Sequence, residues 1–236
     1  YCFFFLFFIT INVNAGVRPF ESTRLMSSGG AGIGSVLVIE SSFLNPAPIA
    51  FYTDSVLYYQ NNKAKVEGND QGLRPSNYGD ATDEAFVIAD TSSALKGTFS
   101  YQKQSENSFK RTRFTSSMSS LIGEATSMGF LYKYTHDKNE NNSHDYFNEL
   151  TLGVTHILSP STIIGFVLND LFLQDKKNEY YMAVGIQQSL FQNFALLLDY
   201  GQNTYVKSSR NSFSRYGLQA NIFADFYVRL GQFYDS

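Results

Sequence analysis

Two pairs of histidine and aspartate flank a polar stretch in the middle of the chain, and they are the residues best suited to metal chemistry. His136-Asp137 precedes the stretch 138–143, and His144-Asp145 follows it at once. Imidazole and carboxylate groups ligate divalent metals when several of them converge on one point. A solvated loop carries the same residue types, and this spacing does not define a ligand set. We therefore expect no metal site and no cofactor.

His156 raises a second chemical possibility, a Ser-His-acid esterase, because Ser, Asn and Asp residues are plentiful in the chain. In such enzymes the nucleophilic serine lies in a recognisable turn motif and is paired with its base in space. No such motif surrounds any serine of this sequence. The sole cysteine, Cys2, lies in the N-terminal apolar stretch described below, so a processed chain has no thiol chemistry. We expect no catalytic residues, and hence a protein that is not an enzyme.

A repeated pattern indicates the elements that position these residues. Gly153, Gly185 and Gly217 each begin a short stretch of the same character, and they are spaced 32 residues apart. Very short breaks follow these stretches, and longer polar connections lie between the breaks. The longer connections span residues 137–145, 174–178 and 206–211. Alternation of tight turns and long loops is typical of transmembrane β-barrels, so the pattern predicts antiparallel β-hairpins in such a barrel.

The composition agrees with a surface that faces lipid. The chain has 22 Phe and 16 Tyr, no Trp, and 17% charged residues. Its mean hydropathy of -0.19 fits a barrel, because a barrel strand needs an apolar residue only at every second position. The net charge of -3 and the lack of a basic cluster argue against nucleic acid as a partner.

The alternation of apolar and polar residues predicts an all-β fold. We expect eleven strands, at about 55–66, 84–90, 94–104, 109–121, 125–136, 146–157, 161–173, 179–190, 194–206, 212–222 and from 226 onward. Most of them are close to the roughly 9 to 11 residues that a tilted strand needs to cross the hydrocarbon layer. We assign the apolar faces to lipid and the polar faces to the interior, because a charge facing the bilayer centre is costly.

Charged and aromatic residues of the expected strands are candidates for the barrel lumen. Asp199 and Arg229 are charged residues within expected strands, so we assign them to the interior or its rim, together with Lys133 and Arg215. The expected strand 161–173 is apolar on both faces. Phe166 and Phe172 of that strand are therefore assigned to an interior that contacts something apolar.

The chain divides into three parts. Residues 1–15 hold an apolar run from Phe3 to Ile9, too short to span a bilayer as a helix, and end in small residues, which predicts a secretion signal peptide. A buried first strand is the alternative for that run. Residues 16–54 are a Gly- and Ser-rich plug, and residues 55–236 are the barrel. Because bacterial barrels close with an even number of strands, we expect further strands beyond these eleven, without which the sheet would not make a stable pore.

The N-terminal part resembles a known family. Its run from Ser27 to Gly34, the following Glu40-Ser41-Ser42 and the sequence Asn45-Pro46-Ala47 resemble the N-terminal hatch of FadL-like outer-membrane proteins, the long-chain fatty-acid transporter family. The same residues fit the related secretion-associated barrel PorV. The resemblance is specific for the hatch motif, whereas the later hairpins share only their general pattern with the family. It leaves the subfamily open.

The resemblance implies a barrel of about 14 strands that is plugged by its own N-terminus in the bacterial outer membrane. It implies passive uptake or binding of a hydrophobic small molecule, such as a long-chain fatty acid. It also implies that membrane lipids and lipopolysaccharide contact the barrel. The residues that would let the hatch pack inside the barrel and shift are Gly29, Gly30, Gly32, Gly34, Asn45 and Pro46. Two alternatives stay open. One is a barrel with a static plug that docks another envelope protein, and the other is a hydrophilic porin.

Overall fold

The computed structural model describes residues 20–66, 79–106, 109–138, 143–172, 181–191, 193–203, 212–223 and 226–235. The signal peptide predicted for residues 1–15 lies outside the described residues. So do the polar connections predicted at 174–178 and 206–211.

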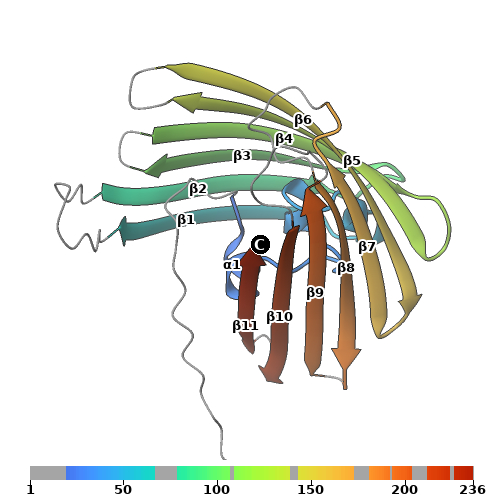
Figure 1. Cartoon of the computed structure of the whole chain (residues 1–236). Helices are drawn as coiled ribbons and strands as arrows, with labels where there is room; N and C mark the ends of the chain where they lie inside the picture. The colour runs from blue at the N-terminus through green and yellow to red at the C-terminus, as the bar shows by residue number, and fades with distance from the viewer. Residues whose placement is uncertain are drawn as a thin grey trace, which may run out of the picture.

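Eleven strands form one antiparallel sheet in which each strand pairs with the next along the chain (Figure 1). The strands are β1 (Val56–Val66), β2 (Gly79–Asp90), β3 (Lys96–Glu106), β4 (Phe109–Leu121), β5 (Thr126–Lys138), β6 (His144–Ser159), β7 (Thr162–Asn169), β8 (Tyr181–Leu190), β9 (Phe194–Asn203), β10 (Ser212–Phe223) and β11 (Phe226–Asp235). The predicted all-β antiparallel fold and its eleven strands are confirmed. β4 has the predicted bounds, whereas β2 begins earlier and β7 ends earlier than predicted.

The sheet is curved and open. Within the described residues the edge strands β1 and β11 are not hydrogen-bonded to each other. The sheet curls around the short N-terminal helices, and β11 comes close to the first of them (Figure 1). Closure into a complete barrel stays a prediction.

Residues 20–55 lie against the concave side of the sheet, and we call them the inner segment. They contain the helix α1 (Thr23–Ser27) and the 3-10 helices η1 (Ile39–Ser42) and η2 (Ala47–Phe51). Ser22 begins α1 as its N-cap, because its hydroxyl accepts a hydrogen bond from the backbone N–H of Leu25 at 3.2 Å. None of the helices in the described part of the chain is long and apolar enough to cross a membrane.

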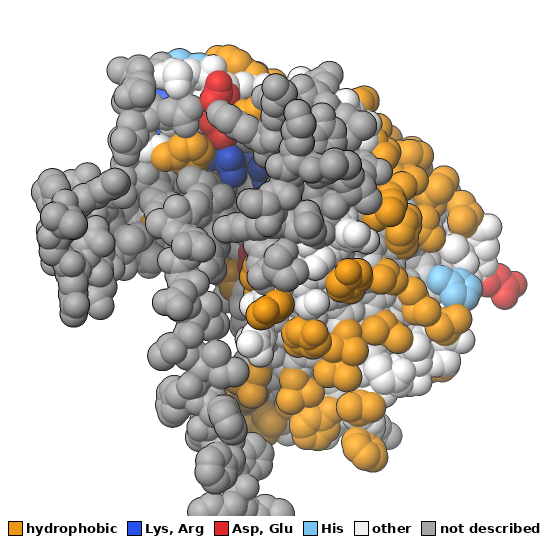
Figure 2. Space-filling model, in the orientation of Figure 1, with side chains coloured by type: hydrophobic (Ala, Val, Ile, Leu, Met, Phe, Trp, Pro, Cys, Tyr) orange, Lys and Arg blue, Asp and Glu red, His pale blue; other side chains and the backbone are white. Residues whose placement is uncertain are grey.

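The two faces of the sheet differ in chemistry. The inner face, which contacts the inner segment, carries small and polar side chains that are buried, among them Thr98, Ser100, Gln102, Thr115, Ser117, Ser119, Thr135, Thr151 and Thr155. The outer face carries large exposed apolar side chains, among them Leu57, Phe99, Phe114, Met118, Phe130, Val184 and Leu230. Figure 2 shows hydrophobic side chains spread over the side of the molecule where β7 to β11 lie. Such a distribution is the reverse of that in a soluble protein.

The apolar core lies between the inner segment and the inner face. One cluster joins Leu25, Ile33 and Leu44 of the inner segment to Val167 of β7 and Ala183 of β8. A second joins Val38 and Ile49 to Ala89 of β2. Among the described residues, the inner segment thus supplies about half of the buried apolar side chains, and the strands place many buried polar side chains around it.

Candidate functional site

The repeated glycines form a surface on which the inner segment packs. We call this surface, formed by Gly153, Gly185, Gly217 and the glycines opposite them, the seat. Gly153, Gly185 and Gly217 lie on the inner faces of β6, β8 and β10. A Cβ atom on Gly185 would lie 2.5 Å from the backbone nitrogen of Gly34, and one on Gly217 would lie 2.9 Å from the carbonyl oxygen of Ser28. Both distances are too short for real atoms. The three repeated glycines therefore present bare backbone to the inner segment.

The register of the sheet widens this seat. Gly129 lies directly opposite Gly153, and Gly165 lies directly opposite Gly185. A Cβ on Gly129 would lie 2.8 Å from the carbonyl carbon of Pro46. Paired glycines thus bring the backbone of the inner segment against the backbone of the wall.

Asp199 of β9 holds the middle of the inner segment. Its Oδ2 atom accepts hydrogen bonds from the backbone N–H groups of Gly32 at 2.8 Å and of Ile33 at 3.1 Å, and its side chain is buried. Arg215 lies directly opposite Asp199 on β10 and donates a hydrogen bond from Nη1 to the carbonyl oxygen of Gly30 at 3.2 Å. A carboxylate and a guanidinium of the wall therefore bind consecutive backbone groups of the inner segment.

Asn45 ties the next turn of the inner segment to β6. Its amide nitrogen donates to the carbonyl oxygen of Ile33 at 2.8 Å and to Oγ1 of Thr155 at 3.1 Å. Its Oδ1 atom accepts from the backbone N–H of Ala47 at 3.1 Å. The buried amide thus uses both its donors and its acceptor, and it places Pro46 on the seat formed by Gly129 and Gly153.

The remaining predicted hatch residues lie along the same line of contact. Gly29 and Gly30 follow α1 with φ angles of 65° and 76°, a backbone conformation that glycine adopts without strain. Gly29 packs against the backbone of Gln232 in β11, and Gly34 packs against that of Gly185. The residues singled out from the sequence therefore lie where the inner segment meets the wall.

The lumen candidates have mixed outcomes. Asp199 lies on the inner face, as described above. Phe166 does not: Gly165 and Val167 face the inner segment, so Phe166 points to the outer face, where it is 39% exposed. This corrects the prediction that placed it in the lumen. Phe172 lies in the turn after β7, 45% exposed, and is not part of the strand that was expected to carry it. Arg229 of β11 is half-buried and donates to Gln219 at 2.9 Å.

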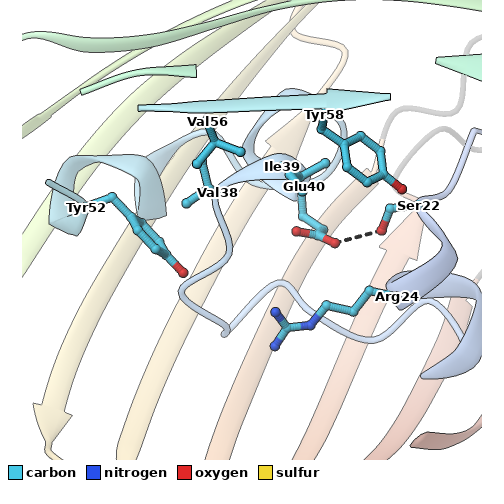
Figure 3. A pocket seen from close by; sticks show the side chains of 8 residues that line it. All are labelled: Ser22, Arg24, Val38, Ile39, Glu40, Tyr52, Val56 and Tyr58. Atoms are coloured by element: carbon cyan, nitrogen blue, oxygen red, sulfur yellow. Dashed lines mark hydrogen bonds between the residues drawn. The ribbon is translucent and has the colours of Figure 1, made fainter. Parts of the chain in front are cut away.

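A pocket of about 220 Å³ lies between the inner segment and β1 (Figure 3). Its lining residues are Ser22, Arg24, Val38, Ile39, Glu40, Tyr52, Val56 and Tyr58. Val38, Ile39 and Val56 make one wall apolar, and Arg24 extends from α1 beneath Glu40. The pocket therefore joins an apolar wall to a cation, which suits an amphipathic ligand.

The polar groups of the pocket are held in place. Ser22 donates from its hydroxyl to Oε1 of Glu40 at 2.6 Å, which fixes the buried carboxylate. The Tyr52 hydroxyl donates to the carbonyl oxygen of Val36 at 2.9 Å, and burial raises the pKa of Tyr52 above its usual value, so this hydroxyl stays protonated. Arg24 donates to Oε1 of Gln219 at 3.3 Å and keeps further N–H groups for a ligand. Sequence reasoning did not single out Arg24, since a lone arginine in a polar segment carries no periodic signal.

A charged network lines the inner face above the inner segment. Lys133 of β5 lies 3.4 Å from Oε2 of Glu149 and donates to Oδ1 of Asn169 at 3.1 Å. Arg111 of β4 and Asp137 of β5 are joined by two hydrogen bonds of 2.7 Å. These buried charges are paired, as charges inside a protein must be.

The residues suited to metal or acid-base chemistry do not converge. His136 and His144 lie on the outer face, whereas Asp137 turns inward to Arg111. In the described part of the chain no three His, Cys, Asp or Glu residues are placed to hold a metal ion together. His156 is exposed and its Nδ1 atom lies 2.7 Å from Oγ1 of Thr126, and no serine is bonded to it among the described residues.

Comparison with known proteins returns no relative. No protein-family model, no curated protein and no solved structure matches the chain.

Proposed function

We propose that the chain is a bacterial outer-membrane β-barrel protein that binds hydrophobic small molecules, such as long-chain fatty acids, for passive uptake. The division of the sheet into an apolar outer face and a polar inner face supports a place in the lipid bilayer. The inner segment would then be the hatch of the barrel. The resemblance of its sequence to the hatch of FadL-like proteins supports the same proposal.

The pocket between the inner segment and β1 carries the proposal about the ligand. Val38, Ile39 and Val56 offer an apolar wall for the first part of an acyl chain, and Arg24 offers a charged donor for a carboxylate. Glu40 is engaged by Ser22 and offsets part of the charge of Arg24. A volume of about 220 Å³ accommodates a headgroup and part of a chain, with the rest extending from the open side.

The contacts of the inner segment suggest how the path would open. Hydrogen bonds from Gly32 and Ile33 to Asp199, and from Asn45 to Thr155, fasten the inner segment to the wall. A shift of the segment breaks these bonds and the bond from Arg215 to Gly30, and at Gly165 and Gly185 its backbone moves over bare backbone of the wall. Ligand binding beside α1 would favour the shifted state if the ligand contacts Arg24 better there.

Binding of a fluorescent long-chain fatty acid to the detergent-solubilised protein tests this proposal. The variant Arg24→Gln loses a charge-assisted hydrogen bond, so we expect its affinity for the acid to fall about tenfold or more. The fatty alcohol of the same chain length should bind both proteins alike. Arg229→Gln is the matched control, because Arg229 contacts the same Gln219 but lies outside the pocket. Equal losses for acid and alcohol would argue against a carboxylate at Arg24.

A docking barrel without transport is the second candidate. It is favoured by the close packing of the inner segment, whose backbone meets the backbone of the wall at Gly129, Gly185 and Gly217. In that case the loops would hold another envelope protein and the lumen would stay shut. Failure of the protein to bind either the fatty acid or the alcohol would favour this candidate.

A further inference from the structure

Two lysines face each other on the outer face, at the end of the sheet where β4 begins and β5 ends. Lys110 of β4 lies directly opposite Lys138 of β5, and Lys138 lies directly opposite His144 of β6. The neighbouring Arg111 and Asp137 pair on the inner face, so the two lysines point outward. Like charges directly opposite each other on an antiparallel pair destabilise it. The electrostatic repulsion between the two lysines therefore destabilises this end of the sheet, and a bound anion would remove that repulsion.

The described residues supply no such anion. Neither Lys110 nor Lys138 forms a hydrogen bond or an ion pair with them. Asp137, the carboxylate next to Lys138 in sequence, is bound by Arg111 on the other face. Within the described part of the chain, the lysine pair thus has no anionic partner.

The histidines beside the lysines do not make this a cation site. Nε2 of His136 and Nδ1 of His144 are hydrogen-bonded to each other at 2.8 Å, so these two nitrogens are not both free to ligate a metal ion. Two ammonium groups in the same part of the face repel a divalent metal ion and attract an anion. Imidazole N–H groups can donate to the same anion.

An aromatic row lies next to the lysines, towards the middle of the sheet. On the outer face Tyr59, Phe86, Tyr101, Phe114 and Tyr134 lie opposite one another in turn across β1 to β5. Apolar side chains follow further along the strands, among them Leu57, Ile88, Phe99, Met118 and Phe130. Aromatic residues gather where a bilayer meets water. The order along the strands, cations and then aromatic and apolar residues, matches a lipid with an anionic head and acyl chains.

We propose that Lys110 and Lys138, assisted by His144, bind the phosphate group of an anionic membrane lipid, whose acyl chains lie along Phe114 and Met118. The inference rests on the proposed membrane location of the outer face. It adds a lipid site on the outside of the wall, apart from the pocket at α1. Bound there, the phosphate neutralises the repulsion between β4 and β5 and fixes the depth of the sheet in the bilayer.

Native mass spectrometry of the detergent-solubilised protein titrated with phosphatidic acid tests the site. We expect Lys110→Gln/Lys138→Gln to bind this lipid about thirty-fold more weakly, or about five-fold for each lysine. The matched control is Lys63→Gln, compared with Lys110→Gln, because it removes one charge from an exposed lysine of β1, three strands away from Lys110. It should bind within about twofold of the unaltered protein, because salt screens distant charges.

Equal losses in Lys63→Gln and Lys110→Gln would overturn the site, since they would indicate attraction to overall charge. Displacement of the lipid by inorganic phosphate at equal concentration would overturn the lipid as ligand and leave a site for free phosphate. Insertion into vesicles of neutral phosphatidylcholine is measured separately. Failure to insert would contradict the membrane location, whereas insertion without selective binding of phosphatidic acid would contradict this inference alone.

Discussion

Replacing Gly185 by alanine should release the inner segment from the wall. The added Cβ would lie 2.5 Å from the backbone nitrogen of Gly34 and would overlap Oδ1 of Asp199, so atoms must move by about 1 Å to reach ordinary contact. Overpacking of this kind costs about 1–3 kcal/mol. Displacement of the Asp199 carboxylate weakens its bonds to Gly32 and Ile33, and a hydrogen bond to a charged group contributes about 1.5–3 kcal/mol.

The two effects together give about 3–5 kcal/mol, which corresponds to at least about a hundredfold increase in local opening. Hydrogen exchange measured by mass spectrometry should show this increase for peptides that cover Gly32 and Ile33, while the amides of β9 exchange as before. Gly123→Ala is the control, because a Cβ on Gly123 has no atom within 4 Å. If Gly185→Ala exchanged like the control, the proposed seat of the inner segment would be refuted.

Two further substitutions test the anchor and the core. Asp199→Asn keeps the shape of the side chain but removes the charge that accepts from Gly32, so proteolysis of the inner segment should become about tenfold faster. Glu124→Gln at an exposed turn should change nothing, and equal rates in both variants would contradict the anchoring role. Ile49→Ala removes a fully buried side chain and should destabilise the protein by about 2–5 kcal/mol, seen as a lower thermal midpoint in detergent. Leu57 is 69% exposed on the outer face, so Leu57→Ala should change the free energy of unfolding by no more than about 0.5 kcal/mol. A larger loss of stability in Leu57→Ala than in Ile49→Ala would show that the core lies elsewhere.

The strands were predictable because alternation on this wall is strict. In β4 the outward positions carry Phe114 and Met118 while the inward positions carry Thr115 and Ser117, so its bounds could be read from the sequence. The glycine repeat was also visible, but its reason was not. A residue 32 positions further along lies two strands on, where it meets another part of the inner segment.

The orientation of β7 was not predictable from hydropathy. Its two faces carry Ile164 and Phe166 on one side and Ile163 and Val167 on the other, so period-two alternation does not distinguish them. Gly165 is the deciding residue, because the glycines of β5, β6, β8 and β10 also lie on the inner face. Applying that rule to β7 would have placed Phe166 outside.

The contacts of the site escape sequence reasoning for a different reason. Asp199 and Gly32 are separated by 167 residues, and Arg24 reaches Gln219 across 195. Their proximity depends on the path of the inner segment along the curved sheet, which no local pattern encodes. The sequence can single out one member of such a pair, such as Asp199 as a charged residue within a strand. It does not indicate which residue the side chain contacts.

Uptake by proteoliposomes that contain the full-length protein tests the proposed function most directly. A labelled long-chain fatty acid and a small sugar are offered side by side, and the protein is compared with Arg24→Gln and with a variant that lacks residues 20–52. We predict uptake of the fatty acid but not of the sugar, reduced by Arg24→Gln and altered by the deletion. Uptake of neither solute, or of the sugar alone, would contradict the account.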